Sequence, residues 1–493
     1  MLGEDMQDHR YTKTQLIDIL DKVVDKTFGE VDTAHVFDKT IDNPKITGIA
    51  GDVVENSILG YPSDSYQAPD LNVDGNDVEL KTTGIRKVSG QFVAKEPMSI
   101  TAVSPEKITD EKFDTSNFWH KLEKMLIVYY HYNSKKPVPA AEYANFYIKG
   151  YDFHVFSDKD RQTLENDWKI VQKFIVSLNE QYGDNAPDQY PRISSEIRNQ
   201  LMLIDTAPKW PHRPRFRLKR STVSAMVQEH FGKKLESLNK TYSTYHDLDI
   251  ELHDLTTKYH GKTIRELMNL LNIPINSEGD KTTVSKSIAE QIISRMFDAK
   301  SKKLNKIEDF NKLGIIAKSI VQTKKGTRTE DTKLFKINFD DLLNTNTPFE
   351  ESDFYNYFNE QQFLCILFEE PNTNAGLLEN KFLGFKRFMF SESFIDYDVK
   401  KTWSEIRDTI QQDKLVDVIK YNNDGSPKVN SKSQVVISAP NFPKSKTNKI
   451  FVRGSGSDSK SKPLVINGVQ MYTQYIWIKG KVFLELLKTT EFI

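Results

Sequence analysis

GIAGDVVENSILGYPSDSYQAPDLNVDGNDVELKTT, the stretch Gly48–Thr83, decides which fold and chemistry we expect of this chain. Val53–Gly60 is typical of the end of a short helix, because glycine is the residue most often found where a helix stops. Glu55 lies on this helix. Further along, Val78–Thr82 alternates between apolar and polar side chains, as a strand does. The stretch therefore predicts a helix followed by a strand.

The polar side chains of this strand have a chemical use. Glu79 and Lys81 are two residues apart, which puts a carboxylate and an ammonium on one face of the strand. A turn at Asp74–Asp77 can bring Asp70 to the same face. Two carboxylates hold Mg²⁺ through oxygen atoms and leave positions for water and a phosphate. A lysine beside them can orient the attacking water and offset charge that develops on the phosphorus.

An alternative interpretation is that Glu79 and Lys81 belong to a solvated strand face. A carboxylate and a lysine in this spacing are common, and the pattern with Asp70 is loose enough to arise by chance. The acidic helix before the strand and a second lysine region after it favour a functional site.

Composition predicts a soluble intracellular chain of about two domains. The chain has 493 residues, too many for one ordinary core. No apolar run approaches the roughly 20 residues of a membrane span, and the acidic N-terminus is unlike a signal peptide. The single cysteine, Cys365, excludes an internal disulfide and a zinc site built on several cysteines. We expect a cytoplasmic protein without a membrane partner. The net charge of −1 argues weakly against nucleic-acid binding. Contacts with nucleic acid would therefore have to come from local clusters of cations.

Several segments together resemble the MutH mismatch-repair nuclease family and its GATC-cutting type II restriction relatives. The first half matches well and the second half more loosely. The matching segments are Gly51–Gly60, Pro69–Asp70, Val78–Thr82, Thr115–Ser116, His120–Leu122 and, towards the restriction relatives, Ile197–Gln200 and Phe216–Ser221.

The resemblance implies roles for five residues. Asp70, Glu79 and Lys81 would be catalytic, with Asp70 and Glu79 as ligands of Mg²⁺, and Glu55 and Lys121 would assist. Asp70 and Glu79 lie two residues further apart than the family pattern, and the Asp-Gly turn can hold the extra residues. The resemblance also implies double-stranded GATC as the target, cut before the G, and a cognate DNA methyltransferase as a genetic partner.

The second half of the chain repeats features of the first half at an offset of about 235 residues. Gly150–Ser157 resembles Gly384–Ser391, and each is followed by a helix that contains a tryptophan, Trp168 or Trp403. At the active motif, Glu79 corresponds to Ile316, which cannot bind a metal. The second half is therefore expected to keep the fold and to lack the chemistry.

The fold class we predict is α/β, with two tandem restriction-endonuclease-like (MutH-like) domains, each a mixed sheet flanked by helices. Residues 1–235 would form the catalytic domain and residues 236–261 a helical connector. Residues 262–493 would form a second, non-catalytic domain that binds DNA and regulates the first.

DNA contacts are expected from a basic stretch near the end of the first half. Lys209–Arg220 contains six lysines and arginines in twelve residues, and alternation predicts one basic face on a strand. A charged edge strand in solvent is the alternative. The candidates for DNA contact are Arg192, Arg198, Arg215, Arg217 and Lys219 in the first half and Arg453, Trp477 and Lys479 in the second.

The sequence thus predicts a Mg²⁺-dependent type II restriction endonuclease that acts on double-stranded DNA. We expect a monomer that pairs on DNA, because one active centre per chain cuts one strand. A mismatch-repair nicking enzyme and a non-catalytic DNA-binding regulator are the alternatives. The doubled length favours restriction, and the intact pair of Glu79 and Lys81 favours an enzyme.

Overall fold

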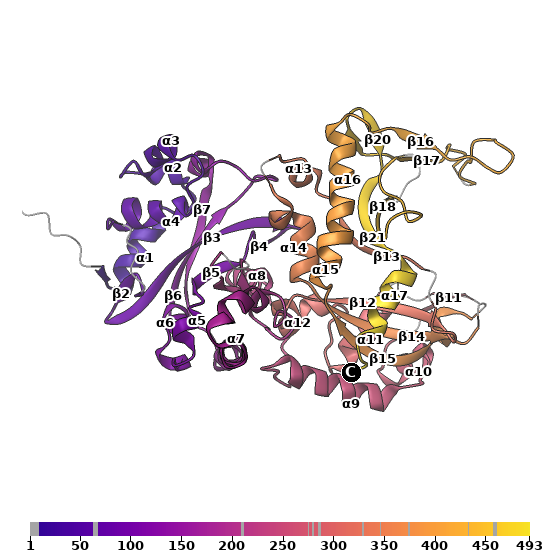
Figure 1. The fold of residues 1–493 in the computed structure, drawn as a ribbon, viewed down its shortest axis with the longest axis horizontal. Helices are drawn as coiled ribbons and strands as arrows, with labels where there is room; N and C mark the ends of the chain where they lie inside the picture. The colour runs from indigo at the N-terminus through magenta and orange to yellow at the C-terminus, as the bar shows by residue number, and fades with distance from the viewer. Residues whose placement is uncertain are drawn as a thin grey trace, which may run out of the picture. The chain divides into compact units, whose positions relative to one another are not determined.

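The computed structural model describes residues 9–493 except 63–67, 209–211, 275, 279–280, 284–286, 328–329, 346, 373–374, 432 and 457–460, and it has a mixed α/β fold (Figure 1). Its contacts divide the chain into two compact units. Unit 1 contains Met1–Ser134, Val138–Glu251 and Phe297–Ile315, and unit 2 contains Lys135–Pro137, Leu252–Met296 and Ile316–Ile493.

Phe297–Ile315 clusters with unit 1, although it lies inside the stretch 262–493 assigned above to the second domain. Ion pairs link it to the start of a long helix of unit 1: Lys312 contacts Asp160 at 2.9 Å, and Asp309 pairs with Lys159. The expected connector is not separate in this division, because the units meet between Glu251 and Leu252, within the helix Tyr245–Tyr259.

A mixed sheet with the strand order β1-β2-β3-β6-β7 forms the centre of unit 1, and β4 pairs with β3 outside this path. β3 runs parallel to β6, while β2 and β7 run antiparallel to their neighbours β3 and β6. A smaller sheet has the order β5-β9-β8. The strands of unit 1 are β1 (Arg10–Tyr11), β2 (Leu71–Val73), β3 (Asn76–Val88), β4 (Gln91–Ala94), β5 (Met98–Ala102), β6 (Met125–His131), β7 (Tyr147–His154), β8 (Ile204–Ala207) and β9 (Arg215–Leu218).

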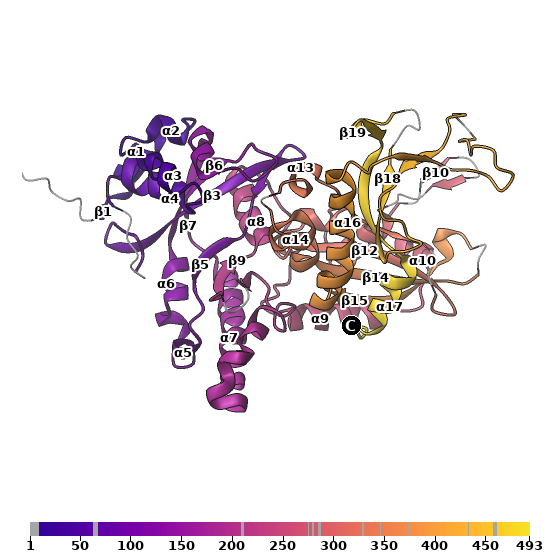
Figure 2. The same ribbon diagram turned by 45° about the horizontal axis from the view of Figure 1, so that its top comes forward.

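Helices cover both faces of the larger sheet. Val78 and Leu80 of β3 pack in one core with Leu16, Leu20 and Val53 from helices on one side. On the other side, α6 contacts β3, and a ring of β6 packs against α8 at 4.9 Å. Figure 2 shows α1–α4 and α8 on opposite sides of β3. The helices of unit 1 are α1 (Lys13–Asp21), α2 (Phe28–Val31), α3 (Lys39–Asp42), α4 (Ile49–Val53), α5 (Pro105–Ile108), α6 (Asn117–Glu123), α7 (Asp158–Tyr182), α8 (Arg220–His230) and α12 (Glu308–Lys312).

The helix expected to end at Gly60 is present, with a local change of winding. α4 continues as a π-helical turn, η2 (Val54–Leu59), and Gly60 follows with a φ of 81°, in the left-handed region. A π-helical turn is rare and often occurs at functional sites. Glu55 lies in this turn.

Unit 2 is built around two three-stranded sheets, β12-β14-β15 and β13-β21-β18. Their strands are β12 (Ile315–Thr323), β13 (Thr332–Lys336), β14 (Gln362–Glu370), β15 (Lys381–Phe388), β18 (Ile450–Ser455) and β21 (Thr473–Ile478). Smaller two-stranded sheets are formed by β10 (Asn276–Glu278) with β11 (Lys281–Thr283), β16 (Asp417–Ile419) with β17 (Ser438–Pro440), and β19 (Leu464–Ile466) with β20 (Val469–Met471). The helices that pack with them are α10 (Ile264–Leu270), α11 (Ile288–Met296), α13 (Phe339–Leu342), α14 (Asp353–Glu360), α15 (Glu392–Phe394), α16 (Lys400–Gln411) and α17 (Gly480–Lys488). α9 (Tyr245–Tyr259) has residues in both units.

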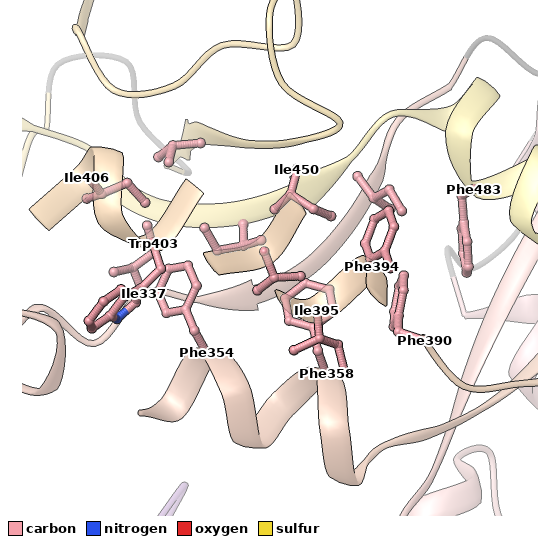
Figure 3. Packing of buried hydrophobic residues seen from close by; sticks show 14 of the residues in the cluster. Ile337, Phe354, Phe358, Phe390, Phe394, Ile395, Trp403, Ile406, Ile450 and Phe483 are labelled. Carbon is pink, nitrogen blue, oxygen red and sulfur yellow. The ribbon is translucent and has the colours of Figure 1, made fainter. Parts of the chain in front are cut away.

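The core of unit 2 is rich in aromatic side chains. Figure 3 shows Phe354 and Phe358 of α14 packing together with Trp403 of α16 and Ile450 of β18. Cys365 is fully buried in β14, where its neighbours are apolar. In the described residues, no helix is both long and apolar enough to cross a bilayer.

The two units present the same succession of elements. Each has a capped helix, α6 or α14, that leads into a buried strand, β6 or β14, and then into an antiparallel partner, β7 or β15. Both strand pairs contain a register shift opposite a glycine with positive φ, Gly150 at 155° and Gly384 at 142°. Later in each unit, the strand of a three-stranded sheet that comes last in the sequence is followed directly by a helix. These pairs are β9 with α8 in unit 1 and β21 with α17 in unit 2.

Candidate functional site

Strand β3 carries the side chains expected to be functional. Val78 and Leu80 point into the core formed with α1 and α4, so alternation directs Glu79 and Lys81 to the opposite face. The parallel pairing of β3 with β6 fixes the positions of Glu79 and Lys81 along the sheet, because Glu79 lies opposite Met125 and Lys81 opposite Ile127. The predicted strand geometry is therefore present.

Glu79 is buried and held by two lysines. Its side chain is 1% exposed. The Nζ of Lys121 lies 2.9 Å from both carboxylate oxygens, and the Nζ of Lys81 lies 2.6 Å from Oε1. A buried carboxylate needs such partners, because removing a charge from water costs several kcal/mol when it is unpaired.

Lys121 reaches this carboxylate from α6. The hydroxyl of Ser116 accepts a hydrogen bond from the backbone N–H of Trp119 and so caps the helix N-terminus. Lys121 lies in the last turn of this seven-residue helix, and α6 leads directly into β6, the neighbour of β3. The resemblance implied Lys121 as an assisting residue, and the structure brings it to Glu79.

Asp70 reaches the same site through the β2–β3 hairpin. Asp74 and Gly75 have φ values of 49° and 80°, which form the tight turn predicted at this Asp-Gly sequence. The Oδ2 atom of Asp70 accepts a hydrogen bond from the backbone N–H of Leu80 at 2.9 Å. This hairpin lies between Asp70 and Glu79, where the spacing exceeds the family pattern.

The electrostatics of Asp70 link it to Glu79. Burial, followed by the negative charge of Glu79, raises the pKa of the Asp70 carboxyl, while Lys121 and Lys81 oppose the rise. The two carboxylates therefore repel each other across a short distance. Bringing a divalent cation between them would remove this repulsion, so the donor set fits Mg²⁺, which binds one or two carboxylates together with waters and phosphate oxygens. No group of three or more metal-binding side chains occurs in the described part of the chain, so water and substrate would complete the coordination.

Glu55 is half-buried in the π-helical turn η2. One helical turn earlier, Gly51 faces Thr82 of β3, where an added Cβ would lie 3.8 Å from the threonine hydroxyl. This packing positions the helix that carries Glu55, whose role stays a prediction.

The basic strand β9 provides fewer exposed cations than its sequence suggests. Arg215 is exposed, and Arg217 forms a two-point ion pair with Asp205, at 2.7 and 3.0 Å. Lys219 is 5% exposed, and its ammonium donates to the carbonyl of Leu201. The alternation predicted for Lys219 stops because β9 ends at Leu218, so Lys219 turns into the protein and does not extend the basic face.

The remaining candidates of unit 1 lie outside the strands. Arg192 is paired with Glu196 at 2.6 Å, next to Tyr182. Arg198 is half-buried in the segment that precedes β8. Lys209, at the start of the basic stretch, lies outside the described residues with 210 and 211.

The candidates of unit 2 form a small cationic and aromatic cluster on β18 and β21. Arg453 stacks on Trp477 at 4.8 Å and pairs with Asp331 at 2.7 Å. Lys479 is half-buried at the N-terminus of α17. Residues 457–460, which follow β18, lie outside the described part of the chain.

Unit 2 has different side chains at the positions that correspond to the site in unit 1. The predicted repeat aligns Ile316 of β12 with Glu79. Tyr357 on α14 lies five residues after the capping Ser352, as Lys121 on α6 lies five residues after the capping Ser116. Lys318 corresponds to Lys81, but its Nζ donates to the backbone carbonyl of Lys333, and burial lowers its pKa to about 8. These residues provide no carboxylate for a metal.

Sequence reasoning missed the partners that restrain these cations. Asp205 lies twelve residues before Arg217 and shares no sequence motif with it. The antiparallel pairing of β8 with β9 places the two residues opposite each other. Asp167 of α7 accepts hydrogen bonds from three successive backbone N–H groups, of Met202, Leu203 and Ile204. An acidic residue on the apolar side of a helix, next to Trp168, was the available signal.

Comparison with known proteins gives two matches. Residues 59–167, which include Asp70, Glu79, Lys81 and Lys121, match the family of the DNA mismatch repair enzyme MutH. The chain is also 26% identical over 376 residues to the type II restriction enzyme Sau3AI of Staphylococcus aureus, a match that covers 72% of each chain. Unit 1 therefore contains a MutH-like domain, as the resemblance of its motifs implied.

Proposed function

We propose that this protein is a type II restriction endonuclease that hydrolyses double-stranded DNA at GATC with the help of Mg²⁺. The observation that carries the proposal is the buried Glu79 held by Lys81 and Lys121 beside Asp70, within the part of the chain that matches the MutH family. Similarity to a restriction enzyme over 72% of the chain supports restriction as the biological role.

We assign the roles from the resemblance to the family, and the positions of the side chains support them. Asp70 and Glu79 would hold Mg²⁺, which supplies Lewis-acid activation of water and of the scissile phosphate when it is bound. Lys81, 18% exposed at the edge of the cluster, would orient the attacking water. Lys121 would contact the scissile phosphate, and Glu55 would orient waters around the metal.

The target sequence rests on the restriction relatives. The resemblance implies cleavage before the G of GATC, and a cognate methyltransferase would protect the same sequence in the host. Arg217 is the first candidate for reading a guanine, because arginine can bond its O6 and N7 atoms simultaneously. Arg192, Arg198 and Arg215 are candidates for phosphate contacts.

We infer that unit 2 is a second MutH-like domain without catalytic activity that binds an effector copy of DNA. Its succession of elements follows unit 1, while Ile316 and Tyr357 replace the metal ligand and its lysine partner. Arg453, Trp477 and Lys479 supply cationic and aromatic groups to a DNA surface on this unit.

Cleavage of a GATC-containing plasmid tests the proposal. Mg²⁺ should permit cleavage at GATC and EDTA should abolish it, and a plasmid without GATC should stay intact. Glu79→Ala and Lys81→Ala should each abolish cleavage while leaving DNA binding largely unchanged, because both side chains belong to the proposed catalytic group. Glu79→Ala should bind DNA slightly more tightly, since a negative charge near phosphate is removed. Cleavage at the wild-type rate by either variant contradicts the assignment.

The match to the MutH family keeps a mismatch-repair nicking enzyme as a second candidate. The same assay separates the two, because a nicking enzyme leaves open circular plasmid whereas a restriction enzyme produces linear DNA. A protein that binds GATC and never cuts it would be a non-catalytic regulator.

A further inference from the structure

Lys121 contacts both carboxylate oxygens of Glu79, the proposed metal ligand. Its ammonium nitrogen is equidistant from the two carboxylate oxygens, 2.9 Å from each. Lys81, by comparison, contacts Oε1 alone. Lys121 thus neutralises the carboxylate from the side on which a cation could contact both oxygens.

These contacts leave little space for a divalent ion beside Lys121. An ionised carboxylate has about four lone-pair sites. Lys121 and Lys81 together make three contacts with Glu79. Mg²⁺ approaches oxygen to about 2.0–2.1 Å, and its double positive charge would repel an ammonium held next to it. The metal and Lys121 therefore compete for Glu79.

We propose that Lys121 is an internal substitute for the metal: it holds Glu79 until a divalent cation displaces it, and its released ammonium then binds a phosphate of DNA. This inference rests on the proposed function, which supplies the metal and the phosphate. Lys121 is in this respect a positioning residue that keeps the metal-free site neutral and folded.

The surroundings of Lys121 explain why its release would favour DNA. The backbone carbonyl of Ala68 lies 3.4 Å from its ammonium, too long for a strong hydrogen bond, and the charge of Asp70 also acts on Lys121. A bound metal would share the charge of Asp70, its other proposed ligand, so an ammonium displaced from Glu79 gains from a new anion, and a DNA phosphate is one. Metal and DNA should therefore increase each other's affinity through Lys121, and the coupling must be reciprocal.

The test measures Mn²⁺ binding to the full chain without DNA, by electron paramagnetic resonance of the free ion. Lys121→Met should bind Mn²⁺ about tenfold more tightly than wild type, the factor that corresponds to 1.4 kcal/mol of removed competition. Lys121→Arg, which keeps the competing charge, should retain the weak wild-type affinity. Glu79→Gln should lose this binding, which identifies the site being measured.

Two lysines of the same region provide matched controls. Lys81→Met removes an ammonium that contacts one oxygen, so its effect on Mn²⁺ affinity should be smaller. Lys124→Met removes the same charge three residues after Lys121, where Lys124 contacts Asn76 at 2.5 Å instead of Glu79. Its Mn²⁺ affinity should equal that of wild type within twofold. An equal gain in all three methionine variants would mean a general charge effect and would overturn the proposal.

A second measurement tests the coupling. A GATC duplex with a non-hydrolysable linkage should strengthen Mn²⁺ binding more in wild type than in Lys121→Met. If Lys121→Met is unfolded without metal, recovery of the wild-type circular dichroism spectrum on addition of Mn²⁺ supports the proposal, and failure to recover overturns it. Unchanged or weaker Mn²⁺ affinity in a folded Lys121→Met also overturns it. Plasmid cleavage is scored separately: tighter Mn²⁺ binding without any wild-type cleavage refutes the proposed function alone.

Discussion

At the scale of single residues, Arg217, the proposed reader of a guanine, is held in place by an ion pair. Its guanidinium forms two parallel hydrogen bonds with Asp205, and both side chains are mostly buried. Such a pair fixes the direction of the arginine, although the carboxylate also places a negative charge near any phosphate. A guanidinium whose direction is already fixed loses little side-chain entropy when it binds a base, whereas Arg215 is exposed.

We predict that Arg217→Ala weakens binding of a GATC duplex by about 1–3 kcal/mol, the value of one good arginine–guanine pair. The loss should be greater for the GATC duplex than for a random duplex of equal length, as measured by fluorescence anisotropy at fixed salt. Arg215→Ala serves as the control, because a phosphate contact weakens binding to both duplexes alike. A uniform loss for Arg217→Ala would make it a phosphate contact as well.

Strand alternation predicted the facing of Glu79 and Lys81, because both lie inside a long strand whose opposite face is apolar. The same reasoning failed at Lys219, one residue beyond the end of β9. Alternation holds only while the backbone stays extended, and the sequence around Leu218 does not show where the strand stops. The pairing of Arg217 with Asp205 depends on strand register, which a single sequence does not specify.

At the scale of elements, Asp167 joins α7 to the segment that leads into β8. Its carboxylate is fully buried and accepts hydrogen bonds from the backbone N–H groups of Met202, Leu203 and Ile204, at 2.7–3.2 Å. Burial raises its pKa to about 6, although these hydrogen bonds and the charge of Lys219 act in the opposite direction. Asp167 thus holds the segment that leads into the smaller sheet of unit 1, and burial of its carboxylate costs desolvation free energy.

The raised pKa predicts a pH dependence of stability. Between about pH 4 and pH 6 the folded chain binds a proton at Asp167 that the unfolded chain has already released. The free energy of unfolding should therefore fall as the pH rises through this window, by about 2 kcal/mol relative to the non-titrating variant Asp167→Asn. Urea unfolding of both proteins at pH 4.5 and pH 7 measures the difference. If the free energy of unfolding changes equally with pH in wild type and in Asp167→Asn, the prediction is wrong.

Local signals predicted several elements, and long-range contacts decided others. Gly60 marked the end of its helix because a left-handed residue is required there, but the π-helical turn before it has no comparable sequence signal. Phe297–Ile315 joins unit 1 through the pairs of Lys312 with Asp160 and Asp309 with Lys159. These partners are about 150 residues apart in the sequence, so composition and periodicity could not identify them.

At the scale of the whole molecule, the proposed catalytic side chains all lie in unit 1. Unit 1 brings Asp70, Glu79 and Lys81 together, whereas Ile316 stands at the position of Glu79 in unit 2. One active centre can cut one scissile phosphate at a time. Under the proposed function, cutting both strands of GATC requires two chains together or two successive encounters, and a unit 2 that binds DNA would favour the first route by holding another copy of the target.

We predict that the protein is a monomer without DNA and pairs when DNA is bound. Plasmids with two GATC sites should be cut faster than plasmids with one site, and short GATC duplexes should stimulate cleavage of the one-site plasmid. A cleavage time course over a range of enzyme and duplex concentrations measures both effects. Analytical ultracentrifugation with and without duplex reports the pairing directly.

Substitutions in unit 2 are the appropriate control for this prediction. Deletion of residues 262–493 would also remove Phe297–Ile315, and with it the ion pairs that this segment makes inside unit 1. Arg453→Ala instead removes a cation that stacks on Trp477 and leaves every residue of unit 1 in place. This variant should retain the basal rate on a one-site plasmid and lose the stimulation by added duplex. Rates that are first-order in enzyme and indifferent to site number and added duplex would mean that unit 2 serves only as a scaffold.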